Sequence, residues 1–352
     1  MRIQANDLVD LATKIFENSG ANNAHAVEVA EHLVQANLKG HDSHGVGMIP
    51  TYANSLKQGY LDPAANIKVL KDKGAILLVD GQTGFGQVVG RQATELALKR
   101  VKNTGIVCLG LRNAHHLGRI GSYGEQCGKA GYASVHFVNV VGHEPQVVPF
   151  GGRDPRMTTN PFCCVVPRKG KSPVVLDMAT SAIALGKVRV AHMKGEPVVP
   201  GALVDHEGQA TTDPAVIYQE PRGALGPFGL HKGYGLALMC ELLGGALAGE
   251  WTAQPEQPRP GTIINNMLMF VFDPDIFDGA EQFQKEVEAM LDYVLSSTPA
   301  KGVDRVRIPG QPEMEAMEER SAQGIEIDDK SWSGISAVAD ALGINTRAVT
   351  SL

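Results

Sequence analysis

Strand-like and helical segments alternate along the middle of this chain, and this alternation constrains its fold more than any other feature. From about residue 66, apolar and β-branched runs recur, with helical patterns between several of them. The runs are AILLVD (75–80), IVCLGL (106–111), ASVHFVNVV (133–141), FCCVVP (162–167), PVVLDMA (173–179) and MLMFVFDP (267–274). Such alternation predicts an α/β core whose sheet is at least partly parallel.

Both ends of the chain have helical patterns instead. Asp7 is a candidate cap for a first helix, Asn22 or Asn23 for a second, and a third covers residues 50–60. Residues 281–297 and 331–344 are helical again, the latter with Ser331 as a possible cap. We therefore expect a helical part (1–65), an α/β ligand-binding core (66–300) and a C-terminal segment (301–352) that packs on the N-terminal helices.

Composition excludes several classes of protein. A net charge of −6 argues against a nucleic-acid-binding protein, which needs a basic face. No apolar run approaches the ~20 residues of a membrane span. The five cysteines are an odd number, and Cys163 and Cys164 are adjacent, which suits reduced thiols. With no signal-peptide pattern at the N-terminus, we expect a cytoplasmic protein.

The segment AILLVDGQTGFGQVVG (75–90) has the outline of a dinucleotide-binding loop. An apolar strand meets Gly84, Gly86 and Gly90, and a helical pattern follows. A Rossmann unit also needs an acidic residue about 20 positions on for the ribose hydroxyls. The next strand ends instead in Arg112 and Asn113. A tight, closely packed turn is therefore the better interpretation of these glycines, although an arginine could meet a 2′-phosphate.

Two histidines, a carboxylate and a hydroxyl occur together in HDSHG (41–45). His41, Asp42, Ser43 and His44 could form a proton relay, because histidine titrates near neutral pH, or they could be a solvated turn rich in capping groups. His41 and His44, with Asp42 and either His115 or His116, could also ligate zinc, as in a hydrolase. No HExxH or paired CxxC pattern supports that alternative, and we expect no metal.

The segment RNAHHLGRIG (112–121) directly follows a predicted strand, where ligand contacts are common in α/β sheets. His115 and His116 point in different directions in most backbones, so we expect only one to face a substrate. His116 could act as a general base, and Arg119 could hold a carboxylate through its two-pronged donor geometry. The alternative is one buried histidine and one exposed arginine.

Two further polar features stand beside apolar segments. Asp177 ends a nearly all-apolar strand, so it needs a partner or a helix to cap, and it could orient a catalytic histidine. His231 and Lys232 come just before a helix of small residues, where backbone N–H groups and a cation could meet a phosphate. The glycines and alanines of that helix could equally serve close packing.

With these motifs, the chain resembles the type-2 malate/L-lactate dehydrogenase family of NAD(P)-dependent oxidoreductases. The resemblance extends from about residue 8 to residue 345 and rests on HDSHGVGMIPTY, DGQTGFGQ, RNAHHLGRIG, TTNPFCCVVP, LDMATSAIALGK, HKGYGLALMCELLGGALAG and IPGQPE. It implies a mixed-sheet, layered α/β core that is not a Rossmann fold, and a glycine loop 84–90 that is structural. It also implies interconversion of a 2-hydroxy acid and its 2-oxo acid in a homodimer, with NAD as the cofactor and NADP as the alternative. Some relatives instead reduce cyclic imino acids such as piperideine-2-carboxylate.

The resemblance also assigns roles to individual residues. The general base matches His116, while some members give the proton-transfer role to the pair Ser43–His44 and to Asp177. The implied cofactor contacts are His44, Gly118, Arg119, Ile120, Val175, Leu176, Asp177, Met178, Ala179, His231, Asn265, Gly310, Gln311, Pro312 and Glu313.

One position departs from the family pattern. Many members carry a substrate-binding arginine four residues after the second histidine of SHG, where this chain has Met48. Most of those members lack an arginine at the position of Arg119. We therefore predict that the carboxylate clamp has moved from position 48 to Arg119, and that Met48 leaves an apolar wall for a larger substrate side chain.

Overall fold

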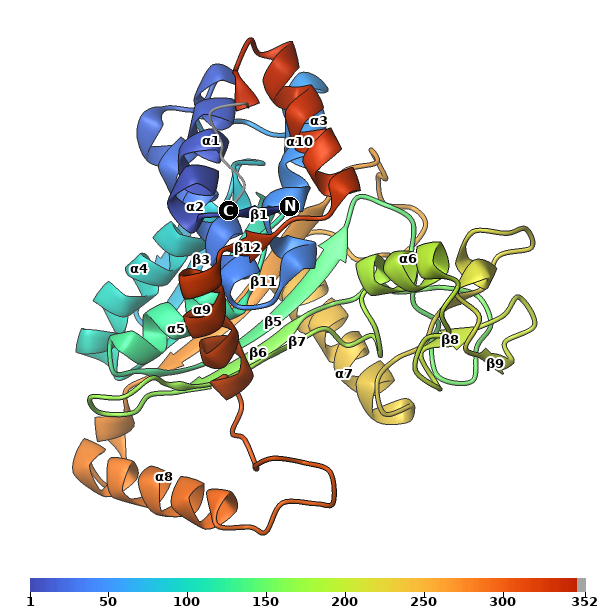
Figure 1. The fold of residues 1–352 in the computed structure, drawn as a ribbon. Helices are drawn as coiled ribbons and strands as arrows, with labels where there is room; N and C mark the ends of the chain where they lie inside the picture. The colour runs from blue at the N-terminus through green and yellow to red at the C-terminus, as the bar shows by residue number, and fades with distance from the viewer. Residues whose placement is uncertain (347–352) are drawn as a thin grey trace.

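The computed structural model describes residues 1–346 and is built around one seven-stranded mixed sheet (Figure 1). In spatial order its strands are β2 (Lys68–Lys73), β3 (Ile76–Asp80), β4 (Ile106–His115), β11 (Ile264–Phe272), β5 (Ala133–Val141), β6 (Phe162–Val166) and β7 (Val174–Met178). Only the pair β3–β4 is parallel, and the other neighbouring pairs are antiparallel. All six predicted strands are present, and the mixed α/β core is confirmed.

The two faces of this sheet are covered by different helices. On β4, Leu109 and Leu111 are fully buried in the same apolar cluster as residues of α4 (Gly86–Thr104) and α5 (Gly121–Lys129). Gly110 points to the other face, where a Cβ would lie 3.1 Å from the Cβ of Ala248. Ala248 ends a π-helical turn, η4 (Glu241–Ala248), that continues α7 (His231–Cys240). The sheet is thus the middle layer of three.

The two ends of the chain form a second apolar core above the sheet. It combines α1 (Ala5–Asn18), α2 (Asn23–Leu38) and α3 (Ile49–Lys57) with α10 (Asp329–Ala341), and α9 (Gln311–Gln323) lies against α2. The strands β1 (Arg2–Ile3) and β12 (Ile325–Glu326) pair and join the two ends directly. In Figure 1 the blue and red segments accordingly lie side by side. The domain boundaries themselves remain a prediction.

Two predicted helix caps are wrong. α1 begins at Ala5, so Asp7 lies inside its first turn rather than at the cap. α10 begins two residues before Ser331, because the carboxylate of Asp328 accepts the N–H of Ser331 at 3.0 Å. The cap at Asn22 is confirmed, since its side chain accepts the N–H of His25 at 2.9 Å.

Two appendages extend from this body. A small three-stranded sheet, β10 (Ala224–Leu225), β8 (Leu203–Val204) and β9 (Ala210–Thr211), forms a lobe with α6 (Leu185–Lys194). The helix α8 (Ala280–Leu295) lies apart from the layers (Figure 1) and has no buried residue. It is tied to the β6–β7 turn by Arg168, whose guanidinium donates to both carboxylate oxygens of Glu288 at 2.7 and 2.8 Å. None of the helices among residues 1–346 is long and apolar enough to cross a membrane.

Candidate functional site

The fold brings together two of the predicted polar segments. His116 directly follows β4, and His44 ends a short 3-10 turn, η1 (Asp42–His44), that follows α2. Their rings stack with centroids 5.4 Å apart and planes 25° apart. The second core, made by the chain ends, thus closes over the end of β4. A pair of imidazoles now stands where a strand end offers side chains to a ligand.

The carboxylate of the HDSHG segment does not belong to this histidine pair. Asp42 accepts hydrogen bonds from Asn37 at 2.8 Å and from Arg320 of α9 at 2.7 Å, and so braces the turn. Ser43 lies beside its neighbour, with Oγ 3.0 Å from Nδ1 of His44. The predicted relay is therefore reduced in this structure to Ser43, His44 and the stacked His116.

The two adjacent histidines point to different partners, as the sequence predicts. Nε2 of His115 lies 3.1 Å from the hydroxyl of Thr262, and its ring packs edge-on against Tyr52. Nδ1 of His116 lies 2.7 Å from the hydroxyl of Tyr52. Because His115 is 1% exposed and turned away from His44, His116 is the one that joins the candidate site.

Burial keeps these rings neutral near pH 7. Burial, reinforced by neighbouring positive charge, lowers the pKa of His44 to about 4. Burial lowers the pKa of His116 well below its ordinary value, and His44 and His115 add to that shift. A neutral imidazole can accept a proton at one nitrogen and donate at the other. The pair therefore suits proton transfer to or from a bound ligand.

Arg119 lies in a buried cluster of charges. Its guanidinium donates to Glu125 at 2.7 Å and lies 3.7 Å from Asp177, and Glu125 also pairs with Lys39. Burial alone would raise the pKa of Glu125, but Arg119 and Lys39 together lower it. With its side chain only 2% exposed, Arg119 already has two carboxylate partners. This arrangement favours a counter-ion role, and the predicted substrate clamp remains a prediction.

Asp177 has the partners that a buried carboxylate at a strand end requires. Besides Arg119, its Oδ2 accepts the N–H of Gly121, the first residue of α5, at 2.8 Å. Burial raises its pKa, while Arg119 and the Gly121 amide act in the opposite direction. Asp177 thus fixes the start of α5 to the end of β7. A role in orienting a histidine stays a prediction.

Three segments predicted to contact a cofactor converge around this aspartate. Residues 118–121 are joined to β7 through Asp177, and β7 is joined to the start of α9, because Val175 N–H donates to the carbonyl of Pro309 at 3.1 Å. At Gly310, a Cβ would lie 3.1 Å from Val175. Nε2 of His41 lies 3.4 Å from Glu313. Two buried side-chain atoms here have no hydrogen-bond partner, Nε of Arg119 and Oε2 of Glu313.

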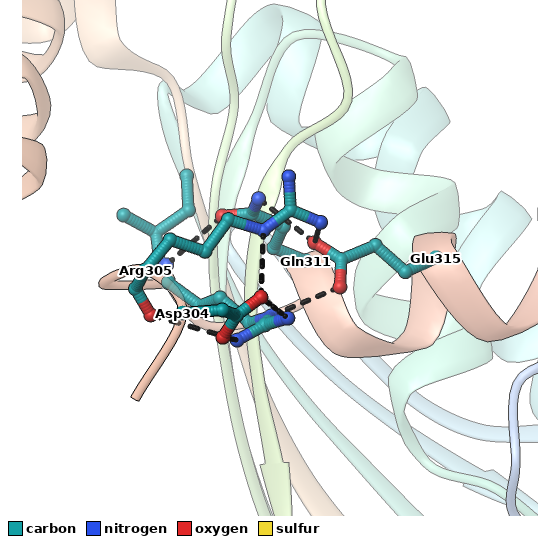
Figure 2. Close-up of polar contacts among 6 residues, drawn as sticks. Asp304, Arg305, Gln311 and Glu315 are labelled. Atoms are coloured by element: carbon teal, nitrogen blue, oxygen red, sulfur yellow. Dashed lines mark hydrogen bonds and ion pairs between the residues drawn. The ribbon is translucent and has the colours of Figure 1, made fainter. Parts of the chain in front are cut away.

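Charged side chains hold the start of α9 in place (Figure 2). Arg307 donates to Glu315 at 2.9 Å and to both oxygens of Asp304 at 2.8 and 2.9 Å. Arg305 pairs with the other oxygen of Glu315 at 2.9 Å. Gln311 donates to Glu315 at 2.9 Å, so its amide is used to shape the turn. The loop before α9 is therefore fixed by its own side chains.

The remaining predicted residues have distinct positions. Asn265 is buried, accepts the N–H of Leu117 at 2.8 Å and donates to the carbonyl of Asn139, so it supports the loop that follows His116. His231 is exposed at the first turn of α7, beside Phe150. Met48 is half-buried before α3 and packs against the second core. None of these three is hydrogen-bonded to the histidine pair.

Three buried residues that support this site were not predicted from the sequence. Tyr52 contacts His116, Gln87 donates to Tyr52 at 2.7 Å, and His32 accepts the N–H of Arg119 at 3.2 Å. Tyr52 and His32 lie in amphipathic helices, where a polar residue is hard to distinguish from one that packs in the core. Gln87 lies in the first turn of α4, within the glycine-containing segment 84–90 that the sequence marks as a turn. In the sequence, a polar residue on the apolar face of a helix is the feature that could have identified these side chains, because a buried polar group needs a hydrogen-bond partner.

Comparison with known proteins identifies the family. The family model for malate/L-lactate dehydrogenase matches residues 3–336. The chain belongs to this family. Hydroxycarboxylate dehydrogenase B of Escherichia coli (strain K12), whose motifs resemble GHDSHGVGMIP and HHLGRIG of this chain, is 45% identical over 345 residues, which cover 97% of this chain and 95% of that protein. Membership makes the chain an oxidoreductase of the dehydrogenase type.

Solved structures agree with this assignment. An E. coli structure described as a malate/lactate dehydrogenase is 44% identical and superposes with a TM-score of 0.93, covering 99% of this chain and 97% of that one. A Δ1-piperideine-2-carboxylate reductase from Pseudomonas syringae pvar. tomato is 31% identical, with a TM-score of 0.81, 96% coverage of this chain and 100% of that one. The fold is therefore shared by dehydrogenases and by a reductase.

Proposed function

We propose that this member of the family interconverts a 2-hydroxycarboxylate and its 2-oxoacid by hydride transfer with NAD(P). The observation that supports this most is the stacked pair of neutral imidazoles at the end of β4, buried His116 and half-buried His44. It lies beside the segments around Asp177 that a cofactor would contact. Proton transfer must accompany hydride transfer to or from a carbonyl carbon, and a positioned imidazole is suited to it.

In oxidation of the hydroxy acid, His116 would take the hydroxyl proton, and protonated His116 would return it in the reverse direction. The cofactor supplies the hydride chemistry, while the protein orients the reacting groups. Ser43 and His44 face His116 across the stacked pair. They would polarise the substrate oxygen that exchanges its proton with His116. Arg119 and Asp177 lie close enough to shape the charge of the site through their mutual pairing.

The residues present fit a nicotinamide dinucleotide. The unbonded Oε2 of Glu313 can accept a hydrogen bond from a ribose hydroxyl. We propose NAD rather than NADP, because both arginines near the start of α9 are already paired with Asp304 and Glu315.

A second candidate substrate class is supported by one comparison. The reductase neighbour acts, by its description, on Δ1-piperideine-2-carboxylate, a cyclic imino acid. The same histidine could then protonate a nitrogen instead of an oxygen. Met48, in place of a family arginine, would then leave an apolar wall that suits a larger or cyclic substrate.

The test follows absorbance at 340 nm with NADH and with NADPH in parallel, against pyruvate, oxaloacetate, 2-oxoglutarate, phenylpyruvate and piperideine-2-carboxylate. The proposal predicts oxidation of NADH with at least one linear oxo acid. Turnover with the cyclic imine alone would assign the reductase activity instead. Silence across the whole panel would contradict both.

We also propose a homodimer in the cytoplasm. The arm α8 carries exposed Met290 and Tyr293, and the segment before it exposes Phe277 at 81%. Apolar side chains on a helix without buried residues are typical of a surface covered by a partner, and a second copy of the chain is the partner that the family resemblance favours. Light scattering after gel filtration tests this: Tyr293→Glu should shift a dimer toward monomer, and a wild-type monomer would refute it.

A further inference from the structure

His116 is held by a chain of two further side chains from two other elements. Nδ1 of its ring lies 2.7 Å from the hydroxyl of Tyr52 on α3. That hydroxyl in turn lies 2.7 Å from the amide of Gln87, in the first turn of α4. Tyr52 and Gln87 are fully buried, and His116 is 8% exposed. No water-exposed group takes part in this series of hydrogen bonds. The protons available to it are therefore those of His116, Tyr52 and Gln87.

The hydroxyl of Tyr52 has a single proton, and this fixes the protonation of the histidine. When the Gln87 amide donates to the hydroxyl, as it does here, the tyrosine proton is free to be donated to Nδ1 of His116. Neutral His116 then carries its own proton on Nε2. Burial raises the pKa of Tyr52, so the phenol keeps its proton and acts only as a donor and acceptor of hydrogen bonds.

The opposite arrangement requires no movement of the ring. In the present orientation, Oε1 of Gln87 is buried and has no hydrogen-bond partner. Turning the amide over would let Oε1 accept from the tyrosine hydroxyl, and the hydroxyl oxygen would then accept from Nδ1–H. Nε2 would become an unprotonated base. An amide is suited to this reversal because its two ends are nearly equal in shape and opposite in hydrogen-bonding character.

We propose that Tyr52 and Gln87 are positioning residues that set which ring nitrogen of His116 carries the proton. This inference rests on the proposed function: with Nδ1 bound to Tyr52, Nε2 is the nitrogen of His116 left for the substrate. With Oε1 of Gln87 toward Tyr52, the ring proton of His116 sits on Nδ1, so the Nε2 lone pair can take the hydroxyl proton in oxidation, and the imidazolium so formed returns that proton from Nε2 in reduction. With the amide N–H toward Tyr52, the ring proton occupies Nε2 and this transfer is blocked in both directions.

Several charged or titratable groups face His116 and act on it in every variant. His44 lies on η1, His115 at the end of β4, His32 on α2 and His143 after β5, and all four lower its pKa. A change at Gln87 has to be measured against this constant background. Variants of Tyr52 and Gln87 leave all four histidines in place.

The kinetic test compares Tyr52→Phe and Gln87→Met with a matched control, Ser55→Ala. Ser55 lies on the same helix as Tyr52, and its buried hydroxyl bonds to Thr262 at 3.0 Å rather than to His116. We expect the first two variants to lower kcat at least tenfold in both directions with little change in KM, and the control to keep wild-type kcat. Wild-type kcat in Tyr52→Phe and Gln87→Met, or an equal loss in Ser55→Ala, would overturn the proposal.

A spectroscopic test does not depend on turnover. Long-range ¹⁵N NMR of histidine-labelled protein, with His116→Asn to assign the signal, reports which nitrogen is protonated. We expect the proton on Nε2 in the ligand-free wild type. In Gln87→Glu, whose carboxylate can only accept, we expect it on Nδ1, with the pKa seen in kcat/KM raised by about one unit. The same tautomer and pH profile in both proteins would overturn the proposal.

The two proposals fail in different ways. If His116→Asn keeps wild-type turnover, the proposed role of His116 is wrong, whatever its tautomer. If His116→Asn is inactive but the Tyr52 and Gln87 variants are unaffected, the proposed function stands and the positioning role falls.

Discussion

Two glycine-containing loops of the same sheet have opposite roles. Residues 81–85 lead from β3 into α4, and residues 116–120 lead from β4 into α5. In the first loop and helix start, glycines are required for close packing: a Cβ at Gly86 would lie 2.2 Å from the carbonyl oxygen of His116. The second loop carries His116 and Arg119 beside His44 and Asp177.

The ends of the two loops are also tied together through Tyr123 of α5. Its hydroxyl lies 2.5 Å from the carbonyl oxygen of Leu117 in the second loop and 3.1 Å from that of Gly86 at the start of α4, so its single proton is shared between them. At Gly90, a Cβ would lie 2.6 Å from the ring of Tyr123. The glycine-rich loop thus acts as the support on which the polar loop rests. A glycine pattern that resembles a dinucleotide-binding fingerprint therefore indicates a ligand site less well than polar side chains that meet at a strand end.

The largest expected effect lies in the second loop. His116→Asn should lower kcat/KM by about 10²–10⁴-fold, because it removes a general acid–base, while the thermal midpoint changes little. The measurement is absorbance at 340 nm with whichever oxo acid the wild type reduces, together with thermal unfolding. Activity within tenfold of wild type would remove the distinction between the loops.

Arg119→Met should mainly affect stability. It leaves Glu125 and Asp177 buried with one cation fewer, and breaking a buried ion pair costs about 3–5 kcal/mol. Urea unfolding measures this, with Arg305→Met as a control, because that exposed pair with Glu315 should cost about 1 kcal/mol or less. A small loss of stability with a KM raised more than tenfold would instead support the substrate clamp.

Gly86→Ala should lower the free energy of unfolding by about 1–3 kcal/mol, because the new Cβ has no space beside the His115 and His116 carbonyls. The control is Gly59→Ala, where φ is +73° and no atom lies within 4 Å, so only backbone strain of about 1 kcal/mol remains. Equal losses in the two variants would show that space at Gly86 is not what the first loop requires.

The smallest expected effect per side chain is a loss of unfolding free energy at acid pH, caused by His32 and His115 behind the second loop. Burial lowers the pKa of His32 to about 3 and of His115 to about 4, both below the unfolded value of 6.5. Their contribution to stability is therefore full above pH 6.5 and is lost as the pH falls toward those values, by about 1.4 kcal/mol per pH unit for each ring. Urea unfolding at pH 7.5, 6.5 and 5.5 should show this loss, with a shallower slope in His115→Gln. Constant or higher stability at pH 5.5 would contradict it.

Much of the fold was predictable from the sequence, since the strand runs are long, apolar and bounded by turns. The pattern also identified His44, His116, Arg119 and Asp177 as exceptional polar residues. It could not show that Arg119 pairs with Glu125, because that residue lies inside a helix whose buried face has no clear period. The role of Tyr52 was equally hidden, because its contact with His116 joins segments from two separate cores.

The most direct test of this account is amide hydrogen–deuterium exchange of the wild type with and without saturating NADH. We expect NADH to slow exchange in peptides covering residues 116–121, 174–179 and 310–315, and to leave peptides covering residues 82–90 unchanged. Protection of residues 82–90 without protection of residues 116–121 would show that the glycine-rich loop holds the cofactor after all, and the account would be wrong.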